Sequence, residues 1–284
     1  MQAITSQIEE VSKYCGTAIT PREELAPPFV PGPIGTHITL RHVTKYFAGQ
    51  PLYQDFNLDI AKGKITSIFG PNGCGKSTMI NLIAGLIPID AGEILFDGKS
   101  LRDTKIGYVF QNYRDALFPW MKAIDNIRYP LKLSGTPKAK IDQRIDELMA
   151  LFGIKFDLGR YPYELSGGQQ QTVSIMRALA PGPEVLFLDE PFSALDYEMT
   201  LLIRDKLQDI FMATHVTIVL VSHDLEEAVY LSDRILLLTK RPTRIAELIS
   251  FDMARPRTLV TLSDPEFIKT KARSLQIFQQ EAHR

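Results

Sequence analysis

Residues 70–77 have the types and spacing of a phosphate-binding loop, G-x-x-x-x-G-K-[ST]. Successive backbone N–H groups can approach a phosphate closely only where side chains are small, so such a loop needs glycine. The Lys76 ammonium group would neutralise phosphate charge, the Ser77 hydroxyl would be a ligand of Mg²⁺, and a helix beginning near Lys76 would direct its positive dipole end at the anion. The pattern predicts a nucleoside triphosphate site. Its predicted contacts are Asn72, Gly73, Cys74, Gly75, Lys76, Ser77 and Thr78.

Two carboxylates follow an apolar run much later in the chain. Residues 185–188 are all apolar, and Asp189 and Glu190 come next. An apolar run of this length fits a parallel strand buried on both faces, and ligands gather at the carboxyl ends of such strands. We expect Asp189 to hold Mg²⁺ through water and Glu190 to polarise the water that attacks the γ-phosphate. Alone, the run would be read as a strand ending in solvated acids, and the phosphate loop favours the catalytic interpretation.

The elements around the phosphate loop have the order that the motif requires. A predicted strand at 64–69 precedes the loop and a predicted helix at 78–84 follows it. Alternating apolar positions predict three further strands, at 38–44, 52–60 and 92–97, which would form a small antiparallel sheet.

The second half of the chain alternates between strand and helix patterns. Helical patterns dominate from about 113 to 180, most clearly at 141–152. Strand patterns return at 184–189, 216–221 and 234–239, separated by helical patterns at 194–213 and 224–231. This βαβ order predicts a parallel sheet and an α/β fold.

The composition favours a cytoplasmic protein. The chain has 284 residues, 45% of them hydrophobic, and a formal net charge of −1, which gives no sign of a nucleic-acid surface. Its two cysteines, Cys15 and Cys74, cannot form a disulfide framework, which suits a reducing compartment. No apolar run reaches the ~18 residues of a membrane span, and no signal peptide is evident. Prolines crowd residues 1–36, which we expect to be a flexible arm before one domain at 37–284.

A further motif lies between the two nucleotide motifs, and with it the chain resembles the nucleotide-binding subunits of ABC transporters from about His37 onward. The matching residues occur in the order of that family: the phosphate loop, Gln111, Leu165-Ser166-Gly167-Gly168-Gln169, Asp189-Glu190, Ser193-Ala194-Leu195-Asp196 and His223. The resemblance implies an ABC ATPase fold. Its parts would be a P-loop NTPase core with a parallel sheet, a small antiparallel β subdomain, and a helical subdomain at about 113–180.

The resemblance also implies a site shared between two subunits. Ser166 and Gly168 begin a helical pattern whose N-terminus can bind an anion. In ABC proteins this end, with Gln169, binds the γ-phosphate of ATP held by the opposite subunit, so two ATP molecules lie in a head-to-tail dimer. From the residues alone, Ser166 is equally well read as a helix N-cap.

Further residue roles are implied by the same resemblance. Gln111 would sense Mg²⁺ and the attacking water, His223 would contact the γ-phosphate and keep Glu190 in place, and Asp196 would shape the dimer interface. Alone, Gln111 reads as a polar loop residue and His223 as a loop or core residue.

Two positions need separate comment. Phe47 lies where the family places an aromatic ring under adenine, with Tyr46 as the second candidate and a core aromatic as the plain alternative. Thr172 departs from the family, which usually has Arg there.

Segments at 116–121, 125–127, 241–245 and 255–257 resemble those of importers for nitrate, taurine and alkanesulfonates. This resemblance implies that the transported solute is small, and an anion such as nitrate, sulfonate, taurine or bicarbonate. It implies as partners two membrane-spanning permease subunits and a periplasmic or lipoprotein solute-binding protein. The ATPase would be peripheral, on the cytoplasmic face of the membrane, as a homodimer or a heterodimer.

Two other functions remain open from the sequence. A soluble ABC ATPase of DNA repair or translation would usually carry coiled-coil insertions, zinc cysteines or tandem nucleotide domains, and none is evident. A regulatory ATP-binding subunit would be expected to lack Glu190 or His223, and both are present.

Overall fold

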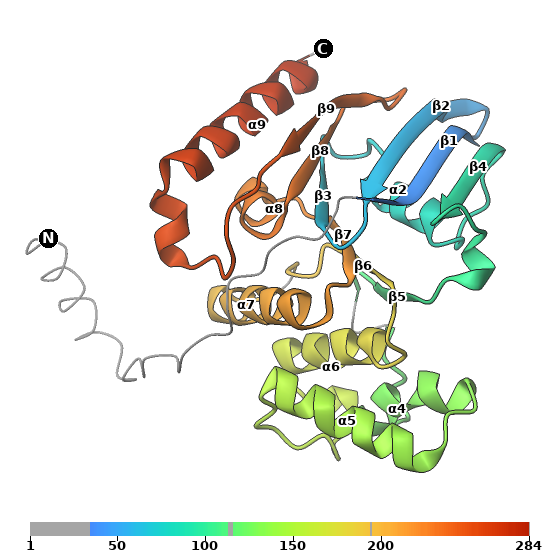
Figure 1. The fold of residues 1–284 in the computed structure, drawn as a ribbon, viewed down its shortest axis with the longest axis vertical. Helices are drawn as coiled ribbons and strands as arrows, with labels where there is room; N and C mark the ends of the chain where they lie inside the picture. Colours follow the sequence, from blue (N-terminus) through green and yellow to red (C-terminus); the bar gives the residue numbers. More distant parts are fainter. Residues whose placement is uncertain (1–34, 113–115, 194, 284) are drawn as a thin grey trace, which may run out of the picture.

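A six-stranded sheet forms the centre of the molecule (Figure 1). The computed structural model describes residues 35–112, 116–193 and 195–283. In spatial order the strands are β5 (Ile106–Val109), β6 (Val185–Asp189), β7 (Thr217–Val221), β3 (Ile65–Phe69), β8 (Arg234–Leu238) and β9 (Ile245–Ser250). Pairing is parallel from β5 to β8, as the sequence predicts, whereas β9 is antiparallel to β8 and is not anticipated.

The central strands β6 and β7 are almost entirely apolar because both faces of the sheet are covered. In β6, Val185 and Phe187 face one core, and Leu186 and Leu188 face the other. The first core is shared with the antiparallel sheet and helix α2 (Lys76–Ile83), and the second with the remaining helices. Successive side chains of a strand point to opposite faces, so a doubly covered strand has no polar face.

The smaller sheet is antiparallel and has the order β2-β1-β4. Its strands are β1 (Thr36–Phe47), β2 (Gln50–Ala61) and β4 (Ala91–Phe96). The predicted strands at 38–44, 52–60 and 92–97 are therefore present, and the first two are longer than expected. Positive φ angles at His42 and Asp55 coincide with shifts in the β1–β2 register, which interrupt the alternating pattern on which the prediction depends. The predicted arm lies outside the described residues except for its last two, and β1 begins at Thr36.

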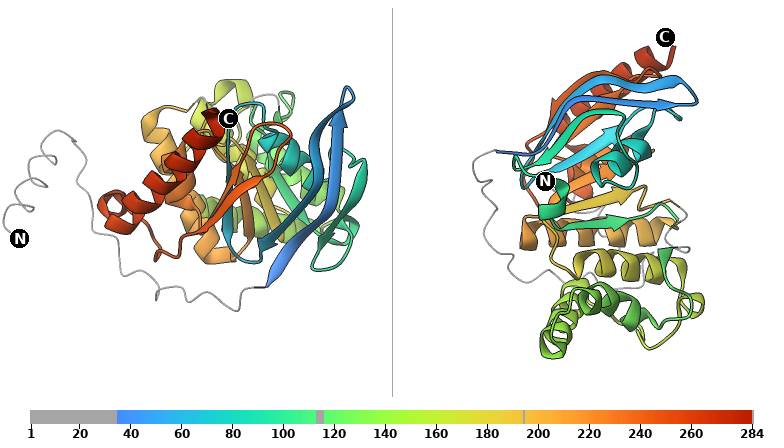
Figure 2. Two further views of the ribbon diagram at one scale, coloured as in Figure 1. Left: turned by 90° about the horizontal axis from the view of Figure 1, so that it is seen from above. Right: turned by 90° about the vertical axis from the view of Figure 1, so that its right-hand side faces the viewer.

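The helices divide between the sheet and a separate layer. Helices α4 (Ala123–Leu133), α5 (Lys138–Phe152) and α6 (Gly167–Leu179) lie together at the end of the molecule away from the antiparallel sheet (Figures 1 and 2). Helix α6 also packs against β5, α8 (Leu225–Leu231) and α9 (Pro265–His283) contact strands of the central sheet, and α7 (Tyr197–Thr214) lies against α5 and α6. Short 3₁₀ turns occur at Leu101–Asp103, Pro162–Glu164 and Leu259–Ser263. In the described part of the chain, no helix combines the length and apolar character needed to cross a bilayer.

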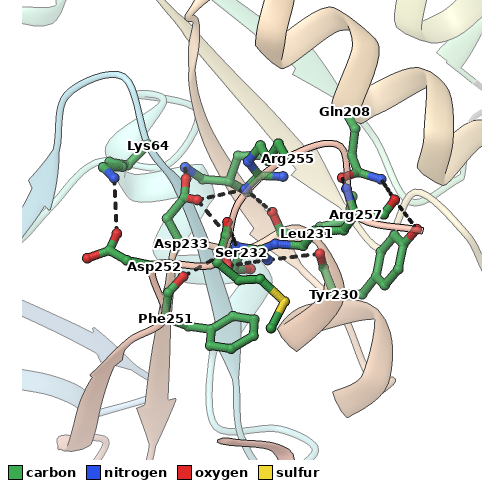
Figure 3. A network of polar contacts seen from close by, with 12 residues as sticks. Lys64, Gln208, Tyr230, Leu231, Ser232, Asp233, Phe251, Asp252, Arg255 and Arg257 are labelled. Atoms are coloured by element: carbon green, nitrogen blue, oxygen red, sulfur yellow. Dashed lines mark hydrogen bonds and ion pairs between the residues drawn. The ribbon is translucent and has the colours of Figure 1, made fainter. Parts of the chain in front are cut away.

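A buried polar network fastens the segment after β9 to the end of α8 (Figure 3). The last carbonyl groups of a helix have no partner within the helix. Arg257 Nη1 donates to the carbonyl oxygens of Val229 (3.1 Å), Tyr230 (2.9 Å) and Ser232 (2.7 Å). The Arg257 side chain is fully buried, and this burial, followed by the nearby Arg255 cation, lowers its pKa.

Asp233 supplies the negative charge of this network. Its Oδ1 accepts a hydrogen bond from Arg255 Nη2 at 2.8 Å, and its Oδ2 accepts one from the backbone N–H of Ile65 at 2.9 Å. The carboxylate therefore connects the two arginines with the first residue of β3. Because β3 leads directly into the phosphate loop, the network supports the strand that positions that loop.

Replacing Arg257 by Ala should lower the free energy of unfolding by about 3–5 kcal/mol, because it leaves several buried carbonyl groups without donors and removes one of the two cations beside the buried Asp233 carboxylate. Urea unfolding followed by circular dichroism measures this. Arg273→Ala is the control, because Arg273 makes only an exposed pair with Glu247, a type worth about 0–1 kcal/mol. Equal losses in the two variants would contradict the role assigned to Arg257.

Candidate active site

The phosphate loop connects β3 to α2 and requires glycine at two positions for conformational reasons. Gly73 has φ 76° and Gly75 has φ 102°, both in the left-handed region. A Cβ atom on Gly75 would also lie 2.9 Å from side-chain atoms of Leu52 and Tyr53. Gly75 is the N-cap of α2, so the helix begins at Lys76, where the motif places it and two residues before the apolar helical pattern at 78–84.

Side chains from other parts of the chain fix the carbonyl groups of this loop. Tyr53 donates its hydroxyl proton to the carbonyl of Gly75 (2.8 Å), and Thr243 Oγ1 donates to that of Cys74 (2.6 Å). Arg241 Nε donates to the carbonyl of Gly73 (2.7 Å). The N–H and C=O of a trans peptide point in opposite directions, so the N–H groups of Gly75 and Lys76 face the other side of the loop, whereas that of Cys74 donates to the carbonyl of Pro71 at 3.2 Å. That side is then rich in donors for an anion.

These three supporting residues are absent from the sequence prediction. Arg241 and Thr243 belong to a segment noted only for its subfamily resemblance, and Tyr53 only as part of a strand. Contacts across 168 or 169 residues of chain leave no local pattern, so no signal in the sequence would have assigned them.

Two of the three predicted Mg²⁺ residues, Ser77 and Asp189, are in direct contact. Ser77 Oγ, on the first turn of α2, donates a hydrogen bond to Asp189 Oδ1, at the end of β6, at 2.8 Å. Burial raises the pKa of Asp189, while the hydrogen bond from Ser77 opposes that rise. A hydroxyl and a carboxylate are oxygen donors of the kind that Mg²⁺ prefers, so these residues fit the ion. The Lys76 ammonium group is buried beside them and donates to the carbonyl of Gly70 at 2.9 Å.

Glu190 lies between the other two predicted catalytic residues. Gln111 Nε2 donates to Glu190 Oε2 at 2.8 Å, and His223 Nδ1 lies 3.4 Å from the same oxygen. Gln111, proposed also as a metal ligand, thus contacts the predicted base rather than Ser77 or Asp189. Glu190 has φ 45°, an uncommon conformation for a residue other than glycine. Such a conformation is typical of functional sites.

The predicted adenine platform lies on a hairpin attached to the phosphate loop. Phe47 and Tyr46 are both exposed, by 41% and 43%, at the end of β1. Lys45 pairs with Tyr53 across the hairpin, and Tyr53 is bonded to the loop at Gly75. The exposure of both rings removes the core-aromatic alternative for Phe47, and the Lys45 ammonium group lies 5.5 Å from the centroid of the Phe47 ring.

Ser166, Gly168 and Gln169 lie elsewhere, at the start of α6. Ser166 is the N-cap: its Oγ accepts from the N–H of Gln169 (3.4 Å), and Gln169 Oε1 accepts from the N–H of Ser166 (3.0 Å). This capping box satisfies two helix N–H groups. A Cβ on Gly168 would lie 2.1 Å from Met199 of α7, so glycine allows the two helices to approach. Within the described residues, no hydrogen bond or ion pair joins this turn to the phosphate loop.

Other residues of α6 and α7 have local partners. Thr172, where the family usually has Arg, donates its hydroxyl proton to the carbonyl of Gly168 at 2.8 Å. Gln171 is fully buried and donates to the carbonyl of Pro191, directly after Glu190, at 2.6 Å. Asp196 is the N-cap of α7 and accepts from the N–H of Met199 at 2.8 Å. Gln171 therefore connects the start of α6 with the segment that carries Glu190.

The fold and this arrangement of residues define an ATP-binding cassette, and comparison with known proteins agrees. The family model described as ABC transporter matches residues 53–193. The chain is 37% identical over 229 residues to an uncharacterised ABC transporter ATP-binding protein of Methanocaldococcus jannaschii, a match covering 80% of this chain and 84% of that protein. The chain belongs to the ABC transporter ATP-binding family and is an ATP-hydrolysing enzyme of that family.

More specific relatives include ATPases named for import. The chain is 44% identical over 208 residues to the sulfate/thiosulfate import ATP-binding protein CysA of Thermosynechococcus vestitus, covering 72% of this chain and 61% of CysA. It is 39% identical over 212 residues to the spermidine/putrescine import ATP-binding protein PotA of Thermotoga maritima, covering 73% of this chain and 57% of PotA. Among solved structures, the dimeric cassette MJ0796 with ADP and Pi superposes with a TM-score of 0.66 at 31% identity, covering 76% of this chain and 99% of that one.

Glu190→Gln should reduce ATP turnover by at least about a hundred-fold while leaving ATP affinity within about two-fold, because it preserves the size of the side chain and removes its charge. Steady-state phosphate release and calorimetric ATP binding measure the two effects. Turnover within a few-fold of the unsubstituted protein would remove Glu190 from this role.

Proposed function

We propose that this chain is the energising subunit of an ABC importer, in which it binds MgATP, dimerises head-to-tail and drives two membrane-spanning permease subunits. The observation that carries the proposal is the meeting of Ser77 with Asp189, and of Gln111 and His223 with Glu190, at one end of the central sheet. Import is supported by the names of CysA and PotA.

Hydrolysis would use the described residues as follows. The loop N–H groups and Lys76 bind and orient the triphosphate. Bound through Ser77 and Asp189, Mg²⁺ would neutralise phosphate charge. The Glu190 carboxylate accepts a hydrogen bond from the attacking water and so orients its lone pair toward the γ-phosphorus. Gln111 and His223, both at Glu190 Oε2, hold that carboxylate in place.

The dimer would complete each site with a second chain. The phosphate loop has donors on one side of the triphosphate. At the start of α6, Ser166 is exposed, Gln169 is half-buried and Gly168 is buried, and none of them has a described hydrogen bond to that loop. A helix N-terminus is suited to an anion. In a head-to-tail pair, α6 of one chain would face the γ-phosphate held by the other, whether the partner is identical or a related ATPase.

The segment before α4 provides a candidate contact for the permease subunits. Phe118 packs with Trp120 (centroids 5.5 Å apart) and Tyr129 (5.0 Å), and Trp120 is 72% exposed. Arg177 of α6 holds this segment by donating to the carbonyl of Ala116 at 2.7 Å. An exposed aromatic cluster on a braced segment is typical of a protein–protein contact. The chain would then lie peripherally on the cytoplasmic face of the membrane and reach a periplasmic or lipoprotein solute-binding protein through the permease.

The solute that we propose is a small anion such as nitrate, sulfonate, taurine or bicarbonate. This proposal rests on the resemblance of the segments at 116–121 and 241–245 to those of importers for such anions. The name of CysA also refers to anions, sulfate and thiosulfate. The name of PotA refers to cationic solutes, spermidine and putrescine, so the names of the relatives support import but not a particular charge of the solute. The proposed class concerns the whole transporter, since the solute contacts the permease and the binding protein.

Purification from membranes distinguishes this function from the two alternatives. We expect the tagged full-length chain, extracted in mild detergent, to retain integral membrane proteins, and Trp120→Asp to lose them while keeping ATP turnover. Ribosomes or DNA in place of membrane proteins would favour a soluble ABC ATPase. A purified protein that binds ATP without turnover would favour a regulatory subunit.

Ser166→Arg should abolish turnover but leave ATP binding by the monomer nearly unchanged, because the added cation blocks closure of the dimer without touching the chain's own phosphate loop. A mixture with Lys76→Ala gives the sharper measurement. Each mixed dimer then has one site with both defects and one with neither, so part of the turnover should return. Dimer formation is measured by light scattering in the same mixtures in which turnover is measured. ATP-dependent dimerisation that survives Ser166→Arg would contradict the shared site.

A further inference from the structure

The turn Ser222–His223–Asp224, between β7 and α8, carries the histidine of the site. His223 is 59% exposed, and its side chain has one described polar contact, with Glu190. Packing around the ring therefore does little to fix its position. The position of His223 depends on the backbone of the turn, and hence on the side chains that bond to that backbone.

Ser222 provides the first of these bonds. Its Oγ accepts a hydrogen bond from the N–H of Asp224 at 3.0 Å, which closes the turn around His223. The one hydroxyl proton has two acceptors in reach, Glu227 Oε2 at 2.7 Å and the carbonyl of Asp224 at 3.1 Å. The carboxylate is the nearer and the stronger acceptor, so it determines the orientation of the hydroxyl. The contact between Ser222 and Glu227 thus sets which way the Ser222 lone pairs face Asp224.

Glu227 is itself held firmly on α8. Its N–H donates to Asp224 Oδ1 at 3.1 Å, so the turn and the helix are also connected through the N-cap. Burial raises the pKa of the Glu227 carboxyl, and the hydrogen bond from Ser222 opposes that rise. Arg204, His223 and Glu227 line one hollow of about 450 Å³ between α7 and α8. The far end of α8 is fastened by Arg257, so the helix is a fixed base for the Glu227 side chain.

Glu226, the preceding residue, has a different environment. It points to α9, where its Oε2 accepts a hydrogen bond from Lys271 Nζ at 2.6 Å, and both side chains are 40% exposed. Two neighbouring glutamates in the first turn of one helix thus differ in partner: Glu226 contacts the C-terminal helix and Glu227 contacts the turn that carries His223. This difference provides a matched pair for experiment.

We infer that Glu227 is a positioning residue of the ATPase: through the Ser222 hydroxyl, its carboxylate holds the turn that keeps His223 beside Glu190. The inference rests on the proposed roles of His223 and Glu190 and adds the residue on which the placement of His223 depends. A displacement of about 1 Å in a catalytic group can lower a rate on the order of a hundred-fold, so loss of this hydrogen bond should appear in turnover.

Glu227→Ala should lower kcat on the order of ten-fold and change the KM for ATP by less than about two-fold, because the turn and not the nucleotide loop is disturbed. Ser222→Ala removes the same contact from the other side and also the bond from the N–H of Asp224, so it should lower kcat at least as much. Glu227→Gln keeps an oxygen acceptor for the Ser222 hydroxyl and should retain most of the activity. Glu226→Ala is the control and should turn over at the rate of the unsubstituted protein. Thermal melting verifies that each variant is folded.

A double-mutant cycle with His223→Ala separates positioning from general support of the fold. If Glu227 acts through His223, Glu227→Ala should cause no further loss of kcat once His223 is absent. The same fractional loss in both backgrounds, or a Glu227→Ala protein with full activity, would overturn the inference. If Glu227→Ala does not fold, Ser222→Ala takes its place in the cycle. Full activity of His223→Ala would instead refute the role proposed for His223, a result distinguishable from both.

Discussion

Parallel pairing of β5, β6, β7 and β3 is the constraint on which the site depends. Val109 pairs with Leu188, Asp189 with Val221, and Val221 with Ile68, so the four strands end at one level. The residues that follow them are therefore neighbours although they come from four separate parts of the chain. A one-residue shift in any of these registers would move one catalytic side chain by about 3.3 Å and break its contact with the next.

The sequence predicts the parts of this arrangement that have a local pattern. Glycine spacing marks the phosphate loop, and apolar runs mark β3, β6, β7 and β8 because both faces of the sheet are covered. The contact of Ser77 with Asp189 was expected from their chemistry. The contact of His223 with Glu190 was expected from family resemblance, since a histidine after a strand has no distinctive pattern of its own. The contact of Gln111 with Glu190 was not expected, because the resemblance assigned Gln111 to Mg²⁺ and the attacking water.

Other parts have no local pattern and were missed. The left-handed backbone of Glu190 follows from its bonds to β7 and Ser193, since its N–H donates to Val221 and its carbonyl accepts from Ser193 Oγ. Strand β9 has a half-exposed pattern that is weaker than the apolar runs. For Ser166 the sequence allowed two roles, a helix N-cap and a residue that binds the nucleotide of a second chain. The structure shows the N-cap. Because a capping residue can also bind an anion, the structure of one chain is compatible with both roles.

The bonds that Arg241 and Thr243 make to the phosphate loop set the size of the smallest fragment with a well-formed loop. The family model ends at residue 193 and the last catalytic candidate is His223, yet two of the loop's carbonyl partners come about twenty residues later. A fragment that ends after the last motif would therefore lack Arg241 and Thr243, two of the residues that hold the phosphate loop in shape. The motifs mark where the chemistry occurs, and the folding unit that supports them extends into the C-terminal part of the chain.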